Sequence, residues 1–248
     1  MKIILSPAKK MKTDTDTMQP IGLPVYLDET ARVLAALQGK SPAELKALWK
    51  CNDKIAAQNI TRLQEMDLRA RLTPAVLAYE GIAYQYMAPA VFEAQQFAYI
   101  QSHLRILSAF YGVLSAMDGV TPYRLEMQSG LAVGDAPNLY DFWGSRLYRA
   151  VRDDSGTIIN LASKEYAKCV EKHITPADRF ITITFCELSG GKLVTKGTYA
   201  KMARGEMVRY MAEHQITDPE DIKGFDRLGF RCRDDLSSPT EFVFQRHP

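Results

Sequence analysis

The chain has 248 residues, of which 46% are hydrophobic and 24% charged, a composition typical of a globular protein with a substantial core. Its formal net charge is only +2, so binding to a polyanion such as nucleic acid would require local clusters of Lys and Arg. The apolar runs are too short to span a membrane or to form a signal peptide, and the four cysteines lack a disulfide-like spacing, so we expect a cytoplasmic protein with reduced thiols and no membrane partner.

Alternating strands and helices are predicted along the chain. A short buried strand over 2–6 is closed by Pro7, and a long polar loop separates it from a helix over 28–38. The clearest helical spacing covers 198–214. The predicted later strands are "LRILSAF", "GTIINLAS", "RFITITFCEL" and "GGKLVT", followed by a terminal hairpin of "FDRLGFRC" and "EFVFQR". No linker or repeat divides the chain, so we predict one α/β (α+β) domain over 1–248 with a mixed sheet flanked by helices.

A helical hairpin is predicted at about 41–64, where Ser41 begins a capping box before the first helix. This element resembles a helix-hairpin-helix, a module that holds a DNA backbone through the amides of its turn. Lys50 and Lys54 carry suitable positive charge. The turn "WKCNDK" lacks the usual glycines, although Asn52 tolerates a left-handed conformation and can take their place. An ordinary helical hairpin is the alternative.

Residues 196–205, "KGTYAKMARG", place positive charge at the expected start of the long helix. Thr198 is a suitable N-cap, and Lys196 comes just before it. Lys201 and Arg204 share one flank of the helix. Free amides and the dipole at a helix start favour an anion, and the Arg204 fork can hold two phosphate oxygens. The segment is either a phosphate site or an ordinary solvated helix face.

Two further polar segments follow predicted strands, beyond whose carboxyl ends the ligands of open α/β sheets bind. Lys9 and Lys10 follow the first strand and either face such a site or are simply solvated. Tyr123 and Arg124 come later and can stack on a base or clamp a phosphate. Glu126 is a candidate for acid–base catalysis, and the alternative is an internal ion pair between Arg124 and Glu126.

No metal or cofactor is expected. Cys169 and His173 share a helix face, but two ligands do not make a structural zinc site. The sequence contains no P-loop, dinucleotide-binding fingerprint or nucleophile elbow.

Five phrases together resemble the YaaA family of peroxide-stress proteins, and the likeness runs from residue 1 to about 246: "SPAKKM", "LRILSAFYGVLSAMDGVTPYRLEM", "LYDFW", "IINLASKEY" and "KGTYAKMARGEMVRY". The resemblance implies a single α/β domain with a positively charged cleft and a helix-hairpin-helix-like element. It also implies DNA binding and a role in limiting iron-driven oxidative damage to DNA, with no reaction firmly attached. The positions that match the family are Lys9, Lys10, Tyr111, Gly112, Tyr123, Arg124, Lys196, Tyr199, Lys201 and Arg204.

The three cationic segments lie far apart in sequence, but each follows a predicted strand. If the strands share one sheet, Lys9, Arg124 and Lys196 can converge on one electropositive cleft. Such a cleft would suit the phosphates of DNA, with salt-dependent and weakly sequence-specific binding. An enzyme acting on a nucleotide or nucleobase is the alternative, since Tyr123, Arg124 and Glu126 include acid–base and clamping groups.

Overall fold

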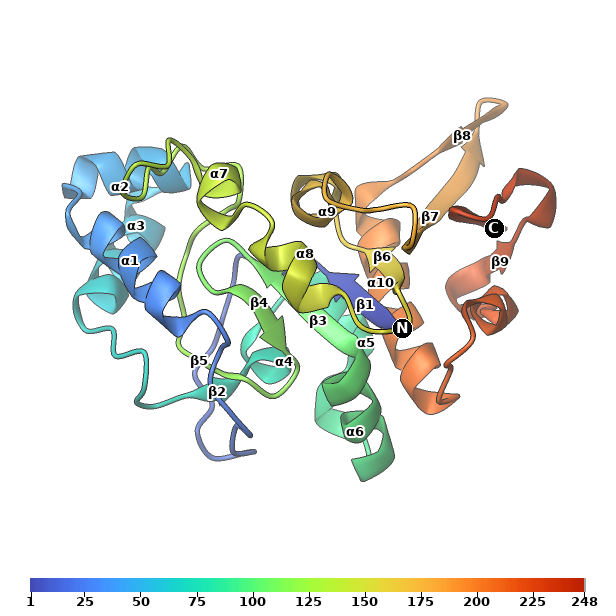
Figure 1. Cartoon of the computed structure of the whole chain (residues 1–248), viewed down its shortest axis with the longest axis horizontal. Coiled ribbons are helices and arrows are strands. Elements are labelled where there is room, and N and C mark those ends of the chain that lie inside the picture. The colour runs from blue at the N-terminus through green and yellow to red at the C-terminus, as the bar shows by residue number, and fades with distance from the viewer. Residues whose placement is uncertain (248) are drawn as a thin grey trace.

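One mixed sheet covered by helices forms the frame of the molecule in the computed structural model, which describes residues 1–247 (Figure 1). The sheet has the order β4-β3-β1-β6-β7-β10-β9, with β8 paired to β7, and β2 and β5 form a separate pair. The strands are β1 (Lys2–Leu5), β2 (Thr73–Pro74), β3 (Leu104–Ser108), β4 (Gly112–Ser115), β5 (Gly119–Val120), β6 (Thr157–Leu161), β7 (Arg179–Ser189), β8 (Lys192–Val194), β9 (Phe230–Cys232) and β10 (Glu241–Arg246). The predicted single domain with a mixed sheet is confirmed.

The helices surround this sheet, and one group of them, α1, α2 and α3, lies at one end of the molecule (Figure 1). The helices are α1 (Leu27–Gln38), α2 (Pro42–Trp49), α3 (Asp53–Gln64), α4 (Ala75–Ala78), α5 (Ile82–Met87), α6 (Ala94–His103), α7 (Leu139–Trp143), α8 (Arg146–Val151), α9 (Lys164–Glu171) and α10 (Gly197–Glu213). Four short 3-10 turns complete the set: η1 (Pro89–Val91), η2 (Pro219–Gly224), η3 (Arg227–Gly229) and η4 (Asp234–Leu236). Over residues 1–247, no helix combines the length and apolarity needed to cross a membrane.

Strand β1 is the centre of the parallel part of the sheet. It pairs in parallel with β3 on one side and with β6 on the other, and Leu5 lies opposite Leu161. Its apolar residues from Ile3 to Leu5 are almost completely buried, as expected for a strand covered on both faces. The chain therefore goes from β1 to β3 and later returns to the other side of β1. This reversal is a topological switch point, where the connections after β1 and β6 leave a crevice.

Helix α10 packs closely against α5 and also contacts α6. The close approach occurs at Gly205, where an added Cβ would stand 1.9 Å from the carbonyl oxygen of Ala83. Only a residue without a side chain fits at this crossing. A second tight contact joins Gly81, just before α5, to Ala8 in the loop after β1, with an added Cβ 2.7 Å away. These contacts fix α5 and α10 over the end of β1.

Two local predictions were wrong, each because another residue takes the special position. Helix α10 begins at Gly197 after the N-cap Lys196, so Thr198 lies inside the helix and does not cap it. In the hairpin, Lys50 adopts the left-handed conformation (φ 45°), whereas Asn52 is extended and accepts a hydrogen bond from the Ile55 amide as the N-cap of α3. The helical hairpin itself and the antiparallel β9–β10 pair are present as predicted.

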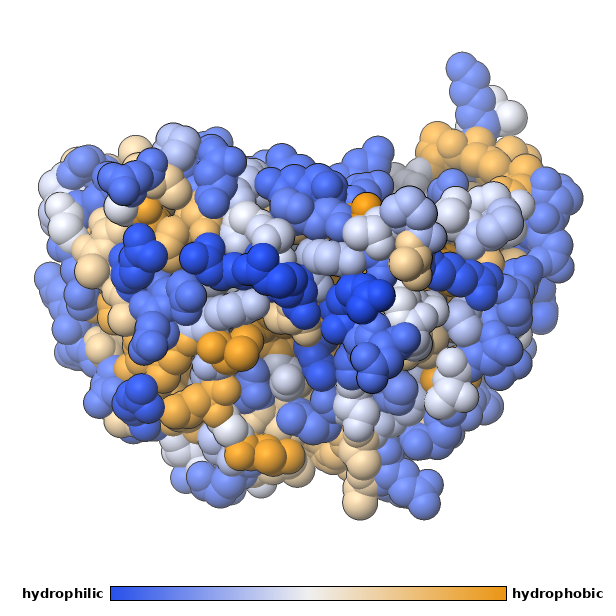
Figure 2. Space-filling view, in the orientation of Figure 1, coloured by the Kyte–Doolittle hydropathy of each residue, from blue (hydrophilic) through white to orange (hydrophobic). Residues whose placement is uncertain are grey.

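The end formed by β7 and β8 projects from the body of the molecule and carries an apolar patch (Figures 1 and 2). Leu188 and Leu193 face each other in the register of these strands, and their exposed fractions are 60% and 44%. The chain passes from this projection through Lys196 into α10. The first turn of α10 therefore belongs to a different surface from the part of the helix that crosses α5.

Candidate functional site

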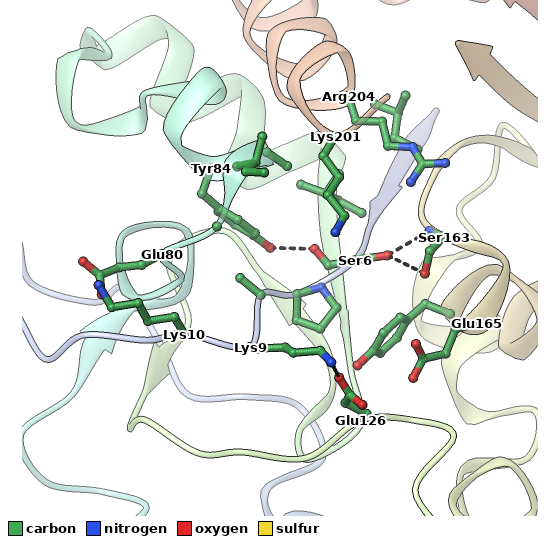
Figure 3. Close-up of a pocket in the computed structure, with 18 of the residues that line it drawn as sticks. Ser6, Lys9, Lys10, Glu80, Tyr84, Glu126, Ser163, Glu165, Lys201 and Arg204 are labelled. Carbon is green, nitrogen blue, oxygen red and sulfur yellow. Dashed lines mark hydrogen bonds and ion pairs between the residues drawn. The ribbon is translucent and has the colours of Figure 1, made fainter. Parts of the chain in front are cut away.

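A cavity of about 480 Å³ lies at the carboxyl ends of β1 and β6, at the switch point of the sheet (Figure 3). It is built from four loop or strand-end segments and one face of α10. The lining consists of residues 5–10, 80–84, 125–126, Leu161, Ser163, Glu165, Tyr166, Lys201 and Arg204. The size and position are those of a site for a small ligand in an open α/β fold.

Hydrogen bonds between the loops after β1 and β6 hold the middle of the cavity. Because Leu5 pairs with Leu161, Ser6 and Ser163 come side by side. The Ser6 hydroxyl donates to the Ser163 hydroxyl at 3.2 Å and accepts from the Ser163 amide at 2.8 Å. The Tyr84 hydroxyl donates to the Ser6 carbonyl at 3.0 Å, which joins α5 to the same point.

Helix α10 supplies the positive side of the cavity. In Figure 3, Lys201 and Arg204 point from α10 toward the Ser6–Ser163 pair. Among residues 1–247, neither of these cations forms an ion pair, and the Arg204 Nε has no hydrogen-bond partner although it is buried. Burial lowers the pKa of Arg204 from its usual value, but a guanidinium remains charged at neutral pH. This side of the site thus holds two cations that no carboxylate of residues 1–247 pairs with directly.

The opposite side of the cavity is acidic and lies beyond Ser6 in Figure 3. Glu126 forms an ion pair with Lys9, whose side chain is 67% exposed. Glu165 accepts a hydrogen bond from the Gln128 amide at 3.1 Å. Burial raises the pKa of Glu165, the Gln128 hydrogen bond lowers it, and the nearby charge of Glu126 raises it. The cavity is therefore polarised: Lys201 and Arg204 form one end, and the other end holds carboxylates, of which Glu126 is paired with Lys9.

The structure brings five of the predicted site residues into this cavity: Lys9, Lys10, Glu126, Lys201 and Arg204. Lys10 lies at the edge and forms an ion pair with Glu80 at 3.1 Å. The predicted alternative of an Arg124–Glu126 pair is not what forms, because Glu126 pairs with Lys9.

The predicted convergence of Lys9, Arg124 and Lys196 on one cavity is wrong, because only Lys9 lines it. Lys196 lies at the start of α10 and forms an ion pair with Glu187 on β7. Arg124 is half-buried outside the lining, and its Nε has no hydrogen-bond partner among residues 1–247. The helix needs a further turn after Lys196 before its side chains reach the cavity.

The aromatic residues predicted at the site lie outside the lining, in or near the core. Tyr123 is only 6% exposed, and its hydroxyl is hydrogen-bonded to those of Tyr79 (2.9 Å) and Ser108 (2.7 Å). Tyr199 stacks under the guanidinium of Arg246, 3.9 Å from the ring centre. Stacking of a base on Tyr123 does not fit this burial.

Two positions that match the family, Tyr111 and Gly112, lie in the core, and two predicted DNA contacts, Lys50 and Lys54, lie on the hairpin. Tyr111 is buried, and Gly112 has φ 76° with the Trp143 ring where a Cβ would stand. Lys50 and Lys54 are exposed on the helical hairpin and do not line the cavity.

Sequence reasoning missed Ser6, Ser163, Glu165, Tyr84 and Tyr166. The segment "SKEY" at 163–166 directly follows the strand "GTIINLA", just as Lys9 and Lys10 follow the first strand. The strand-end argument applied to this segment would have found Ser163 and Glu165. Within residues 1–247, no three His, Cys, Asp or Glu side chains are placed to hold a metal ion together.

The fold and the cavity define the class of the protein: a mixed α/β domain with a cation-bearing pocket at the switch point of its sheet. The chain belongs to the family described as peroxide stress protein YaaA, whose model matches residues 1–236. It is similar to a UPF0246 protein of Agathobacter rectalis, with 69% identity over 99% of both chains. UPF0246 proteins of Lachnoclostridium phytofermentans (51% identity, 98% of this chain and 96% of the relative) and Desulfitobacterium hafniense (52%, 98% and 97%) are also similar.

Proposed function

We propose that this protein acts in the cytoplasmic response to peroxide by binding DNA at the polarised cavity, and that this binding limits iron-driven oxidative damage to the DNA. The observation that carries the proposal is the pair Lys201 and Arg204, two cations without ion-pair partners among residues 1–247 that face one cavity. The peroxide-stress family supports the physiological setting.

Phosphate is the ligand that this end of the cavity suits best. The planar guanidinium of Arg204 matches two phosphate oxygens, and Lys201 adds a point charge beside it. The hydroxyls of Ser6 and Ser163 line the same cavity, Lys201 and Arg204 point toward them in Figure 3, and the pair can exchange its mutual hydrogen bond for one to an anion. Contacts of this kind fix a nucleic-acid backbone without reading its sequence.

The helical hairpin gives a second, weaker contact in this proposal. Lys50 and Lys54 are exposed, and neither forms an ion pair among residues 1–247. Without a concave wall around them, such cations contribute to affinity mainly through release of counterions from DNA.

Titration of a labelled DNA duplex at several salt concentrations tests DNA binding. We expect log affinity to fall linearly with log salt, and Lys201→Gln to weaken binding and to reduce the slope by about one. Lys172→Gln is the matched control, because Lys172 is exposed at the far end of α9 and does not line the cavity. An affinity that does not respond to salt would contradict the proposal.

Protection from iron follows from the same electrostatics, because protein cations on the phosphates displace bound metal cations. Nicking of plasmid DNA by ferrous iron and hydrogen peroxide should slow in the presence of the protein. Lys201→Gln should protect less than Lys172→Gln at equal concentration. Equal nicking with and without the protein would contradict the proposed protection, even if the protein binds DNA.

Catalysis on a nucleotide or nucleobase is a second candidate, and the acidic end of the cavity favours it. Glu165, whose pKa is raised by burial, lies in the same cavity as Glu126, so two carboxyl groups in different environments can act on one ligand. Incubation with nucleotides followed by chromatography would show any product. Turnover that survives in both Glu126→Gln and Glu165→Gln would remove the acidic end from the chemistry.

A further inference from the structure

We propose that the cavity holds a phosphomonoester, at the end of a nucleic-acid strand or on a nucleotide, rather than a phosphodiester within a strand. This inference rests on the proposed DNA binding and makes it more specific. The juxtaposition that carries it is Lys201 and Arg204, which have no ion-pair partner among residues 1–247 and point toward the Ser6–Ser163 pair inside a cavity lined by several chain segments.

The shape of the site favours a chain end. The cations lie at the carboxyl ends of β1 and β6, below the crossing of α5 and α10. A phosphodiester that reached them would need room for the nucleic-acid strand to leave the cavity on both sides of the phosphate. Two tight contacts, of Gly81 with Ala8 and of Gly205 with Ala83, leave little space on the α5 side of the cavity. A terminal phosphate needs room for the strand on one side only.

Charge favours the same ligand. A phosphomonoester carries about −1.5 to −2 charges at neutral pH and three free acceptor oxygens. A phosphodiester carries one negative charge and two free oxygens. Lys201 and Arg204 together supply two positive charges, and the Ser163 hydroxyl beside them supplies a further donor. The site therefore matches a monoester in both charge and number of donors.

The remaining space suits the nucleoside attached to that phosphate. A volume of about 480 Å³ exceeds what a phosphate needs, and the cavity continues from α10 to Glu165 and Glu126. Carboxylates accept hydrogen bonds from exocyclic amino groups of bases, as at cytosine N4. Glu126 is paired with Lys9, so Glu165 is the carboxylate offered to such donors, at the end of the cavity opposite Lys201 and Arg204.

Terminal phosphates have three sources that the structure does not separate: a 5′ end, a 3′ end and a free mononucleotide. Oxidative cleavage of DNA creates strand ends, so the first two sources connect the site to peroxide stress. One titration series distinguishes all three, with a duplex of fixed sequence carrying a 5′ phosphate, a 3′ phosphate or only hydroxyl ends. A covalently closed circle and a mononucleotide serve as competitors.

We expect at least one phosphorylated end to bind about tenfold more tightly than the hydroxyl-ended duplex, the effect of roughly one charge-assisted hydrogen-bond pair. Lys201→Gln and Arg204→Gln should lose this preference, while Lys172→Gln keeps it. Lys201 is exposed, so its variant tests the site even if the substitution at half-buried Arg204 disturbs folding. A mononucleotide that competes as well as a phosphorylated end would identify the free nucleotide as the source.

Equal affinity for phosphorylated, hydroxyl-ended and circular DNA would overturn the phosphomonoester inference, while a steep salt dependence in the same series would leave the proposed DNA binding intact. Failure of the proposed DNA binding would give a different result. If no DNA binds at any salt concentration, the proposed function fails, and binding of a mononucleotide that Lys201→Gln abolishes would still establish the phosphomonoester site.

Discussion

The molecule has two cationic regions that its sequence associates with DNA, and the structure builds them in different ways. The hairpin of α2 and α3 lies at one end of the molecule and exposes Lys50 and Lys54 on a helical surface (Figure 1). The cavity gathers Lys201 and Arg204 between segments that are up to about two hundred residues apart. The hairpin depends on local signals, whereas the cavity depends on strand register and helix crossing. Substitutions in the hairpin and at the helix crossing should therefore differ in their effects on stability and on DNA binding.

The largest effect should come from the helix crossing that positions the cavity. Gly205→Ala places a methyl group 1.9 Å from the Ala83 carbonyl oxygen, and this contact with backbone cannot be relieved by a side-chain rotation. We expect a loss of about 3 kcal/mol in the free energy of unfolding, at the upper end for overpacking. Denaturant unfolding measures it. Gly197→Ala lies in the same helix, where an added Cβ would meet nothing within 4 Å beyond its own helix and chain neighbours in residues 1–247, and should change stability by less than about 0.5 kcal/mol. Equal losses would show that the crossing is not tightly packed.

The next effect separates the two regions as DNA contacts. Arg204→Gln removes an enclosed cation without an ion-pair partner among residues 1–247, and we expect roughly tenfold weaker binding of a DNA duplex. Lys54→Gln removes an exposed, solvated charge and should weaken binding by about threefold or less. Fluorescence anisotropy at one fixed salt concentration measures both. A larger loss at Lys54 would make the hairpin the principal contact.

The same difference explains how much of the molecule its sequence predicts. The mixed sheet, the hairpin and the long helix follow from periodicity and from capping residues such as Ser41, all of which act within a few residues. The sequence does not predict which residues line the cavity together, because Ser6 meets Ser163 only through the register of β1 and β6. Lys196 was expected at the site and lies outside it, because the position of α10 is set at Gly205 and not at its first turn.

A smaller effect should follow from weakening the hairpin alone. Ser41 and Glu44 form a reciprocal capping box at the start of α2, with the Ser41 amide donating to the Glu44 carboxylate at 2.8 Å. Ser41→Ala should lower the free energy of unfolding by about 1 kcal/mol, the usual cost of losing an N-cap side chain. Binding of a phosphorylated duplex should stay within about twofold, since the cavity lining contains no residue of the hairpin. A tenfold loss of binding would instead couple the hairpin to the site.

The smallest effect concerns two carboxyl groups, one in each region, whose pKa values are shifted in opposite directions. Burial raises the pKa of Glu165 above its ordinary value of 4.5, whereas hydrogen bonds from Ser41 lower the pKa of Glu44. Relative to the unfolded chain, the Glu165 contribution to stability is complete below 4.5 and is lost as pH rises through its folded pKa. The Glu44 contribution is present above 4.5 and is lost as pH falls through its folded pKa.

Carbon-13 NMR titration of the two carboxyl groups gives both pKa values directly, and the Gln variants assign the signals. Comparing stability curves should show Glu165→Gln gaining on the parent protein as pH rises above 4.5, and Glu44→Gln gaining on it as pH falls below 4.5. A bound phosphomonoester adds negative charge to the cavity, so it should raise the Glu165 pKa further and leave that of Glu44 unchanged. If the ligand changed the pKa of neither carboxyl group, the phosphate would lie outside the cavity that holds Glu165. The electrostatic difference between the two regions would then have no bearing on binding.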